Sequence, residues 1–132
     1  MAKRYLLDTN ICISMFKNKH GIREKIAQVG FDKCCVSEIT IAELFYGAAK
    51  SNNVKHYEDV AHVIRMFDVI PIYSSLKLYG TVKSELERQG LRLDEFDLLI
   101  GTTAVFSHMV MVTSNTKHFQ RIPNIELEDW SQ

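Results

Sequence analysis

Short, uniformly apolar stretches separated by helical segments constrain the fold of this chain more than any other feature. Three of them lie within "RYLLDT" (4–9), "KCCVSE" (33–38) and "MVMVT" (109–113), and none alternates polar with apolar residues. A strand that is apolar throughout is buried on both faces, as in a parallel sheet covered by helices on each side. We therefore expect an α/β fold with three α/β/α layers and a central, mainly parallel β-sheet.

The segments between these strands carry helical signals. The segment 54–67 predicts an amphipathic helix, because its apolar residues recur at three- and four-residue spacings. The residues of this stripe are Tyr57, Val60, Ala61, Ile64 and Phe67. The expected order is strand 4–9, helices 11–18 and 21–30, strand 33–38, helices 40–51 and 54–67, strand 68–73, helices 75–90 and 94–108, strand 109–113 and edge strand 125–130.

Length and charge narrow the functional classes. A chain of 132 residues, 46% of them hydrophobic, fits one domain over residues 1–132 and leaves no room for a second. Sixteen basic and sixteen acidic residues cancel, so the chain has no global signature of a nucleic-acid binder. Any contact with nucleic acid would depend on a local patch.

The cysteines and the hydropathy indicate in which cellular compartment the protein works. The chain has three cysteines, and neighbours such as Cys34 and Cys35 point to opposite faces of a strand, so they are poorly placed to form a disulfide. No stretch reaches the ~20 apolar residues of a membrane span. We expect a soluble cytoplasmic protein with buried thiols and no membrane partner.

Polar residues follow the predicted strands. Asp8 ends the first strand, Thr113 and Asn115 follow "MVMV", and Glu43 is expected in the first turn of the helix after strand 33–38. Carboxyl ends of parallel strands meet at one edge of a sheet, where ligands bind. Asp97 cannot be placed there from the pattern, because its helix precedes its strand.

Converging carboxylates would repel one another unless protons or a cation neutralise them. Oxygen ligands without clustered His or Cys favour Mg²⁺, with Mn²⁺ as the alternative, and argue against zinc. Three carboxylates that hold Mg²⁺ recur where a phosphodiester is hydrolysed, because the metal stabilises charge on the phosphorus oxygens and lowers the pKa of the attacking water.

Each acid also has a purely structural interpretation. Asp8 could cap a helix that begins near Ile11, and Asp94 could cap the helix that contains Asp97. The residues from Thr40 to Glu43 match the S/T-x-x-E capping box. The pattern alone leaves both interpretations open.

Four segments in order resemble the PIN-domain ribonucleases, and more closely the VapC toxins of type II toxin–antitoxin systems. The segments are "YLLDTNICI", "SEITIAELFYGAAKS", "DEFDLLIGTTA" and "VTSNTKHFQRIPNIELEDW". The resemblance covers nearly the whole chain and implies a single PIN domain.

The resemblance implies roles for individual residues. It makes Asp8, Glu43 and Asp97 the catalytic, metal-binding acids, with Asp94 as a nearby acid of less defined role. Residues expected to orient the acids are Asn10, Thr113 and Asn115, and those expected to contact RNA are Lys117 and Arg121. Many PIN domains place a fourth acid where this chain has Asn115, so we expect one well-occupied Mg²⁺ site and a weaker second one.

The resemblance also implies a function. We expect a Mg²⁺-dependent endoribonuclease that acts as a toxin and inhibits translation by cleaving structured RNA, first of all the anticodon loop of initiator tRNA. The alternatives are cleavage of ribosomal RNA and a catalytically silent PIN scaffold that only binds RNA or protein. The expected partners are a VapB-type antitoxin and a second copy of the chain, in a homodimer or a larger toxin–antitoxin assembly.

Two packing expectations complete the sequence interpretation. Tyr46 and Trp130 could stack on a base, whereas helical spacing assigns Phe45 to the core. The small residues Gly101 and Ala104 are expected to let their helix approach the sheet closely.

Overall fold

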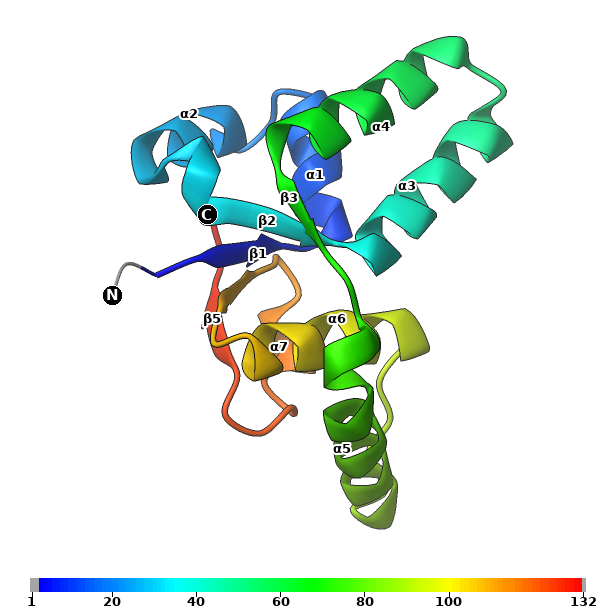
Figure 1. Cartoon of the computed structure of the whole chain (residues 1–132), viewed down its shortest axis with the longest axis vertical. Helices are drawn as coiled ribbons and strands as arrows, with labels where there is room; N and C mark the ends of the chain where they lie inside the picture. Colours follow the sequence, from blue (N-terminus) through cyan, green and yellow to red (C-terminus); the bar gives the residue numbers. More distant parts are fainter. Residues whose placement is uncertain (1–2, 132) are drawn as a thin grey trace.

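A parallel five-stranded sheet forms the centre of the computed structural model, which describes residues 3–131 (Figure 1). The strand order is β3-β2-β1-β4-β5, and every neighbouring pair is parallel. The strands are β1 (Tyr5–Leu7), β2 (Cys34–Ser37), β3 (Asp68–Ile70), β4 (Val110–Val112) and β5 (Glu126–Glu128). Because β1 lies at the centre, the residue that follows it enters the middle of the carboxyl edge.

Helices cover both faces of this sheet, which confirms the expected three-layer α/β/α fold. Figure 1 shows α1 to α4 on one side of the sheet and α5 to α7 on the other. The helices are α1 (Thr9–Phe16), α2 (Ile22–Val29), α3 (Glu38–Ser51), α4 (Val54–Met66), α5 (Leu76–Arg88), α6 (Glu95–Phe106) and α7 (Thr116–Phe119). Two short 3-10 helices, Phe31–Lys33 and Tyr73–Ser75, connect them.

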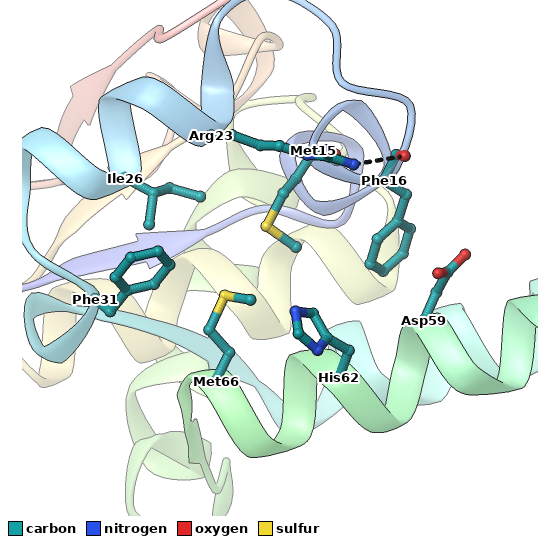
Figure 2. A pocket seen from close by; sticks show the side chains of 8 residues that line it. All are labelled: Met15, Phe16, Arg23, Ile26, Phe31, Asp59, His62 and Met66. Atoms are coloured by element: carbon teal, nitrogen blue, oxygen red, sulfur yellow. Dashed lines mark hydrogen bonds between the residues drawn. The ribbon is translucent and has the colours of Figure 1, made fainter.

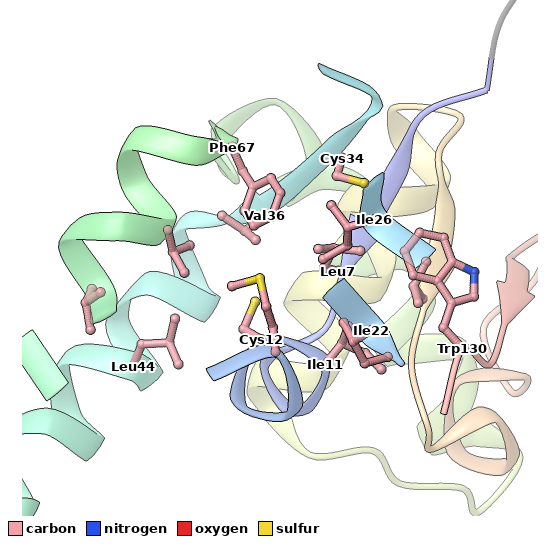
Figure 3. Packing of buried hydrophobic residues seen from close by; sticks show 14 of the residues in the cluster. Leu7, Ile11, Cys12, Ile22, Ile26, Cys34, Val36, Leu44, Phe67 and Trp130 are labelled. Atoms are coloured by element: carbon pink, nitrogen blue, oxygen red, sulfur yellow. The ribbon is translucent and has the colours of Figure 1, made fainter. Parts of the chain in front are cut away.

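Alternate strand residues supply two separate hydrophobic cores. Leu7 and Val36 pack with α1 to α4 (Figure 3), whereas Leu6 and Met111 pack with α5 and α6. All four side chains are fully buried, so the three inner strands β1, β2 and β4 are apolar because each serves both cores. The central sheet is therefore held from both sides.

The cysteines follow the same alternation. Cys34 belongs to the first core and Cys35 to the second, and both are buried free thiols, as is Cys12. Burial raises the pKa of the Cys12 thiol to about 12, so it is protonated at neutral pH. The prediction of buried, unpaired thiols is confirmed.

The starts of two helices differ from the expected ones. The hydroxyl of Ser37 accepts from the Ile39 N–H at 3.0 Å and caps α3. Thr40 therefore lies inside the helix, so the capping-box interpretation of the residues from Thr40 to Glu43 is wrong. Helix α1 begins at Thr9, two residues earlier than expected, because Asp8 is its N-cap.

Several side chains lie elsewhere than their spacing suggested. On α4, Tyr57 and Ile64 are exposed and Val63 is buried instead, because α4 packs on the core through a narrower stripe. Trp130 is 6% exposed and packs against Tyr5, which removes it as a platform for a base. These corrections reflect tertiary contacts that a helical period does not encode.

Phe45 and Gly101 also differ from expectation. Phe45 is 42% exposed and faces the Tyr57 ring, so it does not belong to the core. A Cβ on Gly101 would lie 3.2 Å from Phe119 and closer still to Ile122. The glycine therefore allows close approach of α7 and the turn that follows it, while Ala104 is fully buried in the core that Leu6 and Met111 form on this face of the sheet. No element was predicted for α7.

Within residues 3–131, no helix is both long and apolar enough to cross a bilayer.

Candidate active site

Asp8 is held by two donors at the carboxyl end of β1. Its Oδ1 accepts from the Thr9 N–H and its Oδ2 from the Thr113 hydroxyl, both at 2.8 Å. The side chain is only 4% exposed. Burial raises the pKa of this carboxyl, and the two hydrogen bonds partly offset the rise. The hydrogen bond predicted from Thr113 is present, and Asp8 is both a helix cap and a candidate ligand.

Glu43 reaches the same place from α3. It lies in the second turn of the helix, not the first, because α3 begins at Glu38. Its Oε1 accepts from the Thr9 hydroxyl at 2.6 Å. Burial raises the pKa of Glu43 and the Thr9 hydrogen bond lowers it, while the charges of Asp8 and Asp94 raise it further.

The third and fourth acids come from the start of α6. Asp94 caps the helix, because its Oδ1 accepts from the N–H groups of Phe96 at 2.9 Å and Asp97 at 3.3 Å. Its structural interpretation is therefore correct. Asp97 is half-buried in the first turn of α6, and burial is the main cause that raises its pKa to about 7.

Charge repulsion links Asp97 to the other acids. After burial, the next causes of its raised pKa are the carboxylates of Asp8, Asp94 and Glu43. The three acids predicted as metal ligands, with Asp94 beside them, therefore lie close enough to interact electrostatically, and they include the one that the strand pattern could not place. A proton on Asp97 or a bound cation would relieve this repulsion.

The donor set suits a hard divalent cation. Asp8, Glu43 and Asp97 offer carboxylate oxygens, and neither their hydrogen bonds nor the charges that shift their pKa values involve a histidine or thiol. Within residues 3–131, no three His, Cys, Asp or Glu side chains are gathered tightly enough to form a ready-made metal cage. Mg²⁺ does not need one, since it keeps several waters and binds through one or two carboxylates plus substrate phosphate.

Of the two asparagines predicted to orient the acids, Asn115 contacts Thr113, whereas Asn10 has no side-chain hydrogen bond to Asp8 within residues 3–131. Asn10 is exposed, and no hydrogen bond joins its side chain to Asp8 in the described part of the chain. The Asn115 N–H donates to Thr113 Oγ1 at 3.0 Å, so Asn115 supports Thr113 through its backbone. Its side-chain amide lies 3.0 Å from His118 Nδ1 and is engaged there.

The two predicted RNA contacts lie on or just beyond α7. Lys117 is exposed. Arg121 donates from Nη1 to the carbonyl of Arg92 at 2.9 Å, which ties the end of α7 to the loop before α6. These cations remain predicted contacts with RNA, and the structure places Arg121 against the loop that leads to Asp94.

Sequence reasoning missed two threonines. The Thr9 hydroxyl lies 2.6 Å from Glu43 and 3.1 Å from the hydroxyl of Thr40, which is fully buried. The available signal was the position of Thr9 directly after Asp8. That position alone does not reveal the contact with Glu43, because nothing in the linear order indicates that α3 passes beside Thr9.

The comparisons with known proteins agree with this geometry. A PIN domain family model matches residues 5–125. The tRNA(fMet)-specific endonuclease VapC of Shigella flexneri is 34% identical over 131 residues, which cover 97% of this chain and 98% of that protein.

Solved structures agree as well. VapBC2 from Rickettsia felis, bound to a DNA fragment from their promoter, is similar with a TM-score of 0.87 and 32% identity over 96% of this chain and 98% of that one. DNA-bound VapBC from Salmonella typhimurium is similar with a TM-score of 0.84 and 32% identity, over 97% and 98% of the two chains.

Proposed function

This chain belongs to the VapC ribonucleases of the PIN-domain family, and on that premise we propose that it is a Mg²⁺-dependent endoribonuclease that cleaves tRNA. The observation that carries the proposal is the acidic cluster, in which Asp97 takes a pKa of about 7 from burial and from the charges of Asp8, Asp94 and Glu43. A site that concentrates unneutralised negative charge can bind a divalent cation strongly and use it on a phosphodiester.

Asp8, Glu43 and Asp97 would hold Mg²⁺ or Mn²⁺, and the bound cation would supply an activated water and stabilise charge on the scissile phosphate. Asp8 provides the rigid side of the site, since two hydrogen bonds fix its carboxylate. Exposed Lys117 and neighbouring Arg121 would bind the RNA backbone. The products would carry a 3′-hydroxyl and a 5′-phosphate.

The substrate assignment rests on the relative that is named a tRNA(fMet)-specific endonuclease. We expect cleavage in the anticodon loop of initiator tRNA. The test is incubation of purified protein with total RNA and Mg²⁺, with and without EDTA, followed by mapping of the cleaved ends. Cleavage of ribosomal RNA alone would support the nuclease activity and contradict the tRNA substrate. Intact RNA under all conditions would contradict both assignments.

The proposed partner is a VapB-type antitoxin, because the similar structures are VapBC proteins. A pocket of about 330 Å³ opens between α1, α2 and α4, lined by apolar side chains such as Met15 and Met66 (Figure 2). A second pocket of about 460 Å³ shares Phe16 and Asp59 with it and extends to Glu43. A single antitoxin segment that occupied both adjoining pockets would reach Glu43, one of the candidate metal ligands.

Growth experiments test the toxin assignment. Expression of the chain alone should arrest growth, and co-expression of the antitoxin encoded beside it should restore growth. Asp8→Asn is the matched control, since it should be harmless at the same level of expression. Normal growth with abundant wild-type protein would contradict the toxin assignment.

A homodimer is proposed as well. Exposed apolar side chains on α3 and α4, among them Tyr46 and Val54, offer surfaces for a second copy. Sedimentation should give twice the 15.2 kDa mass of the chain at micromolar concentration. A mass of 15.2 kDa under those conditions would contradict the dimer.

A further inference from the structure

Thr9 contacts two of the candidate ligands at once. Its backbone N–H donates to Asp8 Oδ1 at 2.8 Å, and its side-chain hydroxyl lies 2.6 Å from Glu43 Oε1. Asp8 follows β1 and Glu43 belongs to α3, so these acids are 35 positions apart in the chain. Thr9 is the first residue of α1 and stands between them.

The hydroxyl proton of Thr9 is directed at Glu43. A threonine hydroxyl has one proton, and an ionised carboxylate can only accept. Of the two acceptors beside it, Glu43 Oε1 at 2.6 Å is nearer and charged, whereas Thr40 Oγ1 at 3.1 Å is farther and neutral. Hydrogen bonds to charged acceptors are the shorter and stronger ones.

Glu43 depends on this hydrogen bond more than Asp8 depends on any single donor. Asp8 has two donors, from Thr9 and Thr113. For Glu43, Thr9 supplies the one hydrogen bond found among residues 3–131. A glutamate side chain has three rotatable bonds and loses much of its freedom when it binds a ligand, so a hydroxyl that fixes it beforehand favours binding.

We propose that Thr9 is a positioning residue that fixes the Glu43 carboxylate beside Asp8, so that both oxygens face one divalent cation. The proposal rests on the proposed function, in which these two acids hold Mg²⁺. Thr9 acts through its hydrogen bond to Glu43 and is not itself proposed as a ligand. Partners that orient metal ligands typically contribute 10- to 100-fold in metal affinity or activity, which sets the expected size of the effect.

The test compares three variants of the full chain. Thr9→Val keeps the shape of the side chain and removes the hydroxyl, Thr9→Ser keeps the hydroxyl and removes the methyl group, and Thr9→Ala removes both. Titration calorimetry with MgCl₂ and with MnCl₂ measures binding without any reaction. The rate of tRNA cleavage, measured over a range of Mg²⁺ concentrations, then separates the Mg²⁺ concentration at half-saturation from the maximal cleavage rate.

We expect Thr9→Val and Thr9→Ala to weaken Mg²⁺ binding by about 10-fold and to raise the Mg²⁺ half-saturation to match, with Thr9→Ser within about 2-fold of wild type. In a Glu43→Gln background, Thr9→Val should cause little further loss, because the residue acts through Glu43. Thr9→Ala keeps the test decisive if valine prevents folding.

Two results would overturn the inference alone. One is wild-type Mg²⁺ affinity in both variants without the hydroxyl. The other is a Thr9→Ser variant as impaired as Thr9→Val, which would assign the effect to methyl packing. If the wild-type chain itself binds no divalent cation and leaves RNA intact, the proposed function fails and this inference fails with it.

Discussion

The end of β1 and the start of α6 contribute acids to the same site, and burial raises the pKa of both Asp8 and Asp97, but only Asp8 has side-chain hydrogen bonds that partly offset the rise. At the end of β1, Asp8 is buried and two hydrogen bonds stabilise its ionised form. At the start of α6, Asp97 is half-buried, and burial and three neighbouring carboxylates raise its pKa to about 7. Asp94, the other acid there, is engaged by the N–H groups of its own helix.

The difference teaches how such a site combines rigidity with affinity. An acid that hydrogen bonds fix and partly compensate gives the site its geometry, because its position does not depend on a ligand. An acid whose charge is not compensated raises the free energy of the empty site, because it repels the neighbouring carboxylates. A bound cation or proton removes this repulsion, and the relief adds to the free energy of binding. Removing either acid should therefore impair activity, but with different effects on stability.

The largest effect is expected at Asp8. Asp8→Asn should lower cleavage by about 1000-fold, the upper range for loss of a principal electrostatic contact, without unfolding the protein. The amide oxygen can still accept from Thr9, and its NH₂ group can donate to the Thr113 hydroxyl, which is free to rotate. Cleavage assays beside thermal melts measure both quantities. Near-normal cleavage would show that Asp8 serves only as a helix cap.

Glu43→Gln should reduce cleavage by at least ~100-fold and leave the metal-free melting temperature unchanged. Glutamine retains an oxygen that can accept from Thr9 but lacks the charge that a hard cation requires. The measurement is a cleavage titration against Mg²⁺ with a parallel melt. Unchanged Mg²⁺ dependence would remove Glu43 from the ligand set.

Thr113→Val tests the compensated side of the comparison directly. Removing one donor to Asp8 should lower cleavage by about 10-fold and destabilise the protein by ~1–2 kcal/mol, because a buried acceptor loses its partner. Thr113→Ser is the matched control and should behave like wild type in urea unfolding and in cleavage. Equal losses in both variants would point to packing of the methyl group.

The smallest effect concerns the contribution of Asp97, whose charge is not compensated, to the free energy of unfolding. Because the pKa of Asp97 rises from 3.8 to about 7 on folding, the folded protein binds more protons there between these pH values. Its contribution to the free energy of unfolding is therefore highest below pH 4 and falls as the pH rises toward 7. In EDTA at pH 8, Asp97→Asn should be more stable by about 1 kcal/mol after allowance for solvent screening, or about 3 °C in melting temperature.

That gain should shrink toward zero at pH 4, and the exposed acid Asp32 supplies the control. Asp32→Asn should show no such pH-dependent gain, because Asp32 precedes β2 at the amino edge of the parallel sheet, whereas Asp8 follows β1 at the carboxyl edge. An equal gain for both variants would mean that overall charge, not repulsion within the site, raises stability. Mg²⁺ should reverse the order of wild type and Asp97→Asn.

Much of the fold could be predicted because its determinants are local. Uniformly apolar strands such as "MVMV" predicted a parallel sheet, and Leu6 and Leu7 indeed serve opposite faces. Asp94 was foreseen as a possible cap and is one, since a cap needs only the next three residues. The capping box at Thr40 failed because Ser37, three residues earlier, competes for the same helix start.

By itself, the sequence determined which residues could do chemistry and in what order they follow the strands. Only the tertiary structure decided that Asp97 joins Asp8 and Glu43, and that Thr9 lies between two of them. It also decided that Trp130 is buried and Phe45 exposed. The physical reason is that strand and cap signals depend on neighbouring residues, whereas burial and electrostatic interaction depend on segments far apart in the chain that packing brings within a few ångströms.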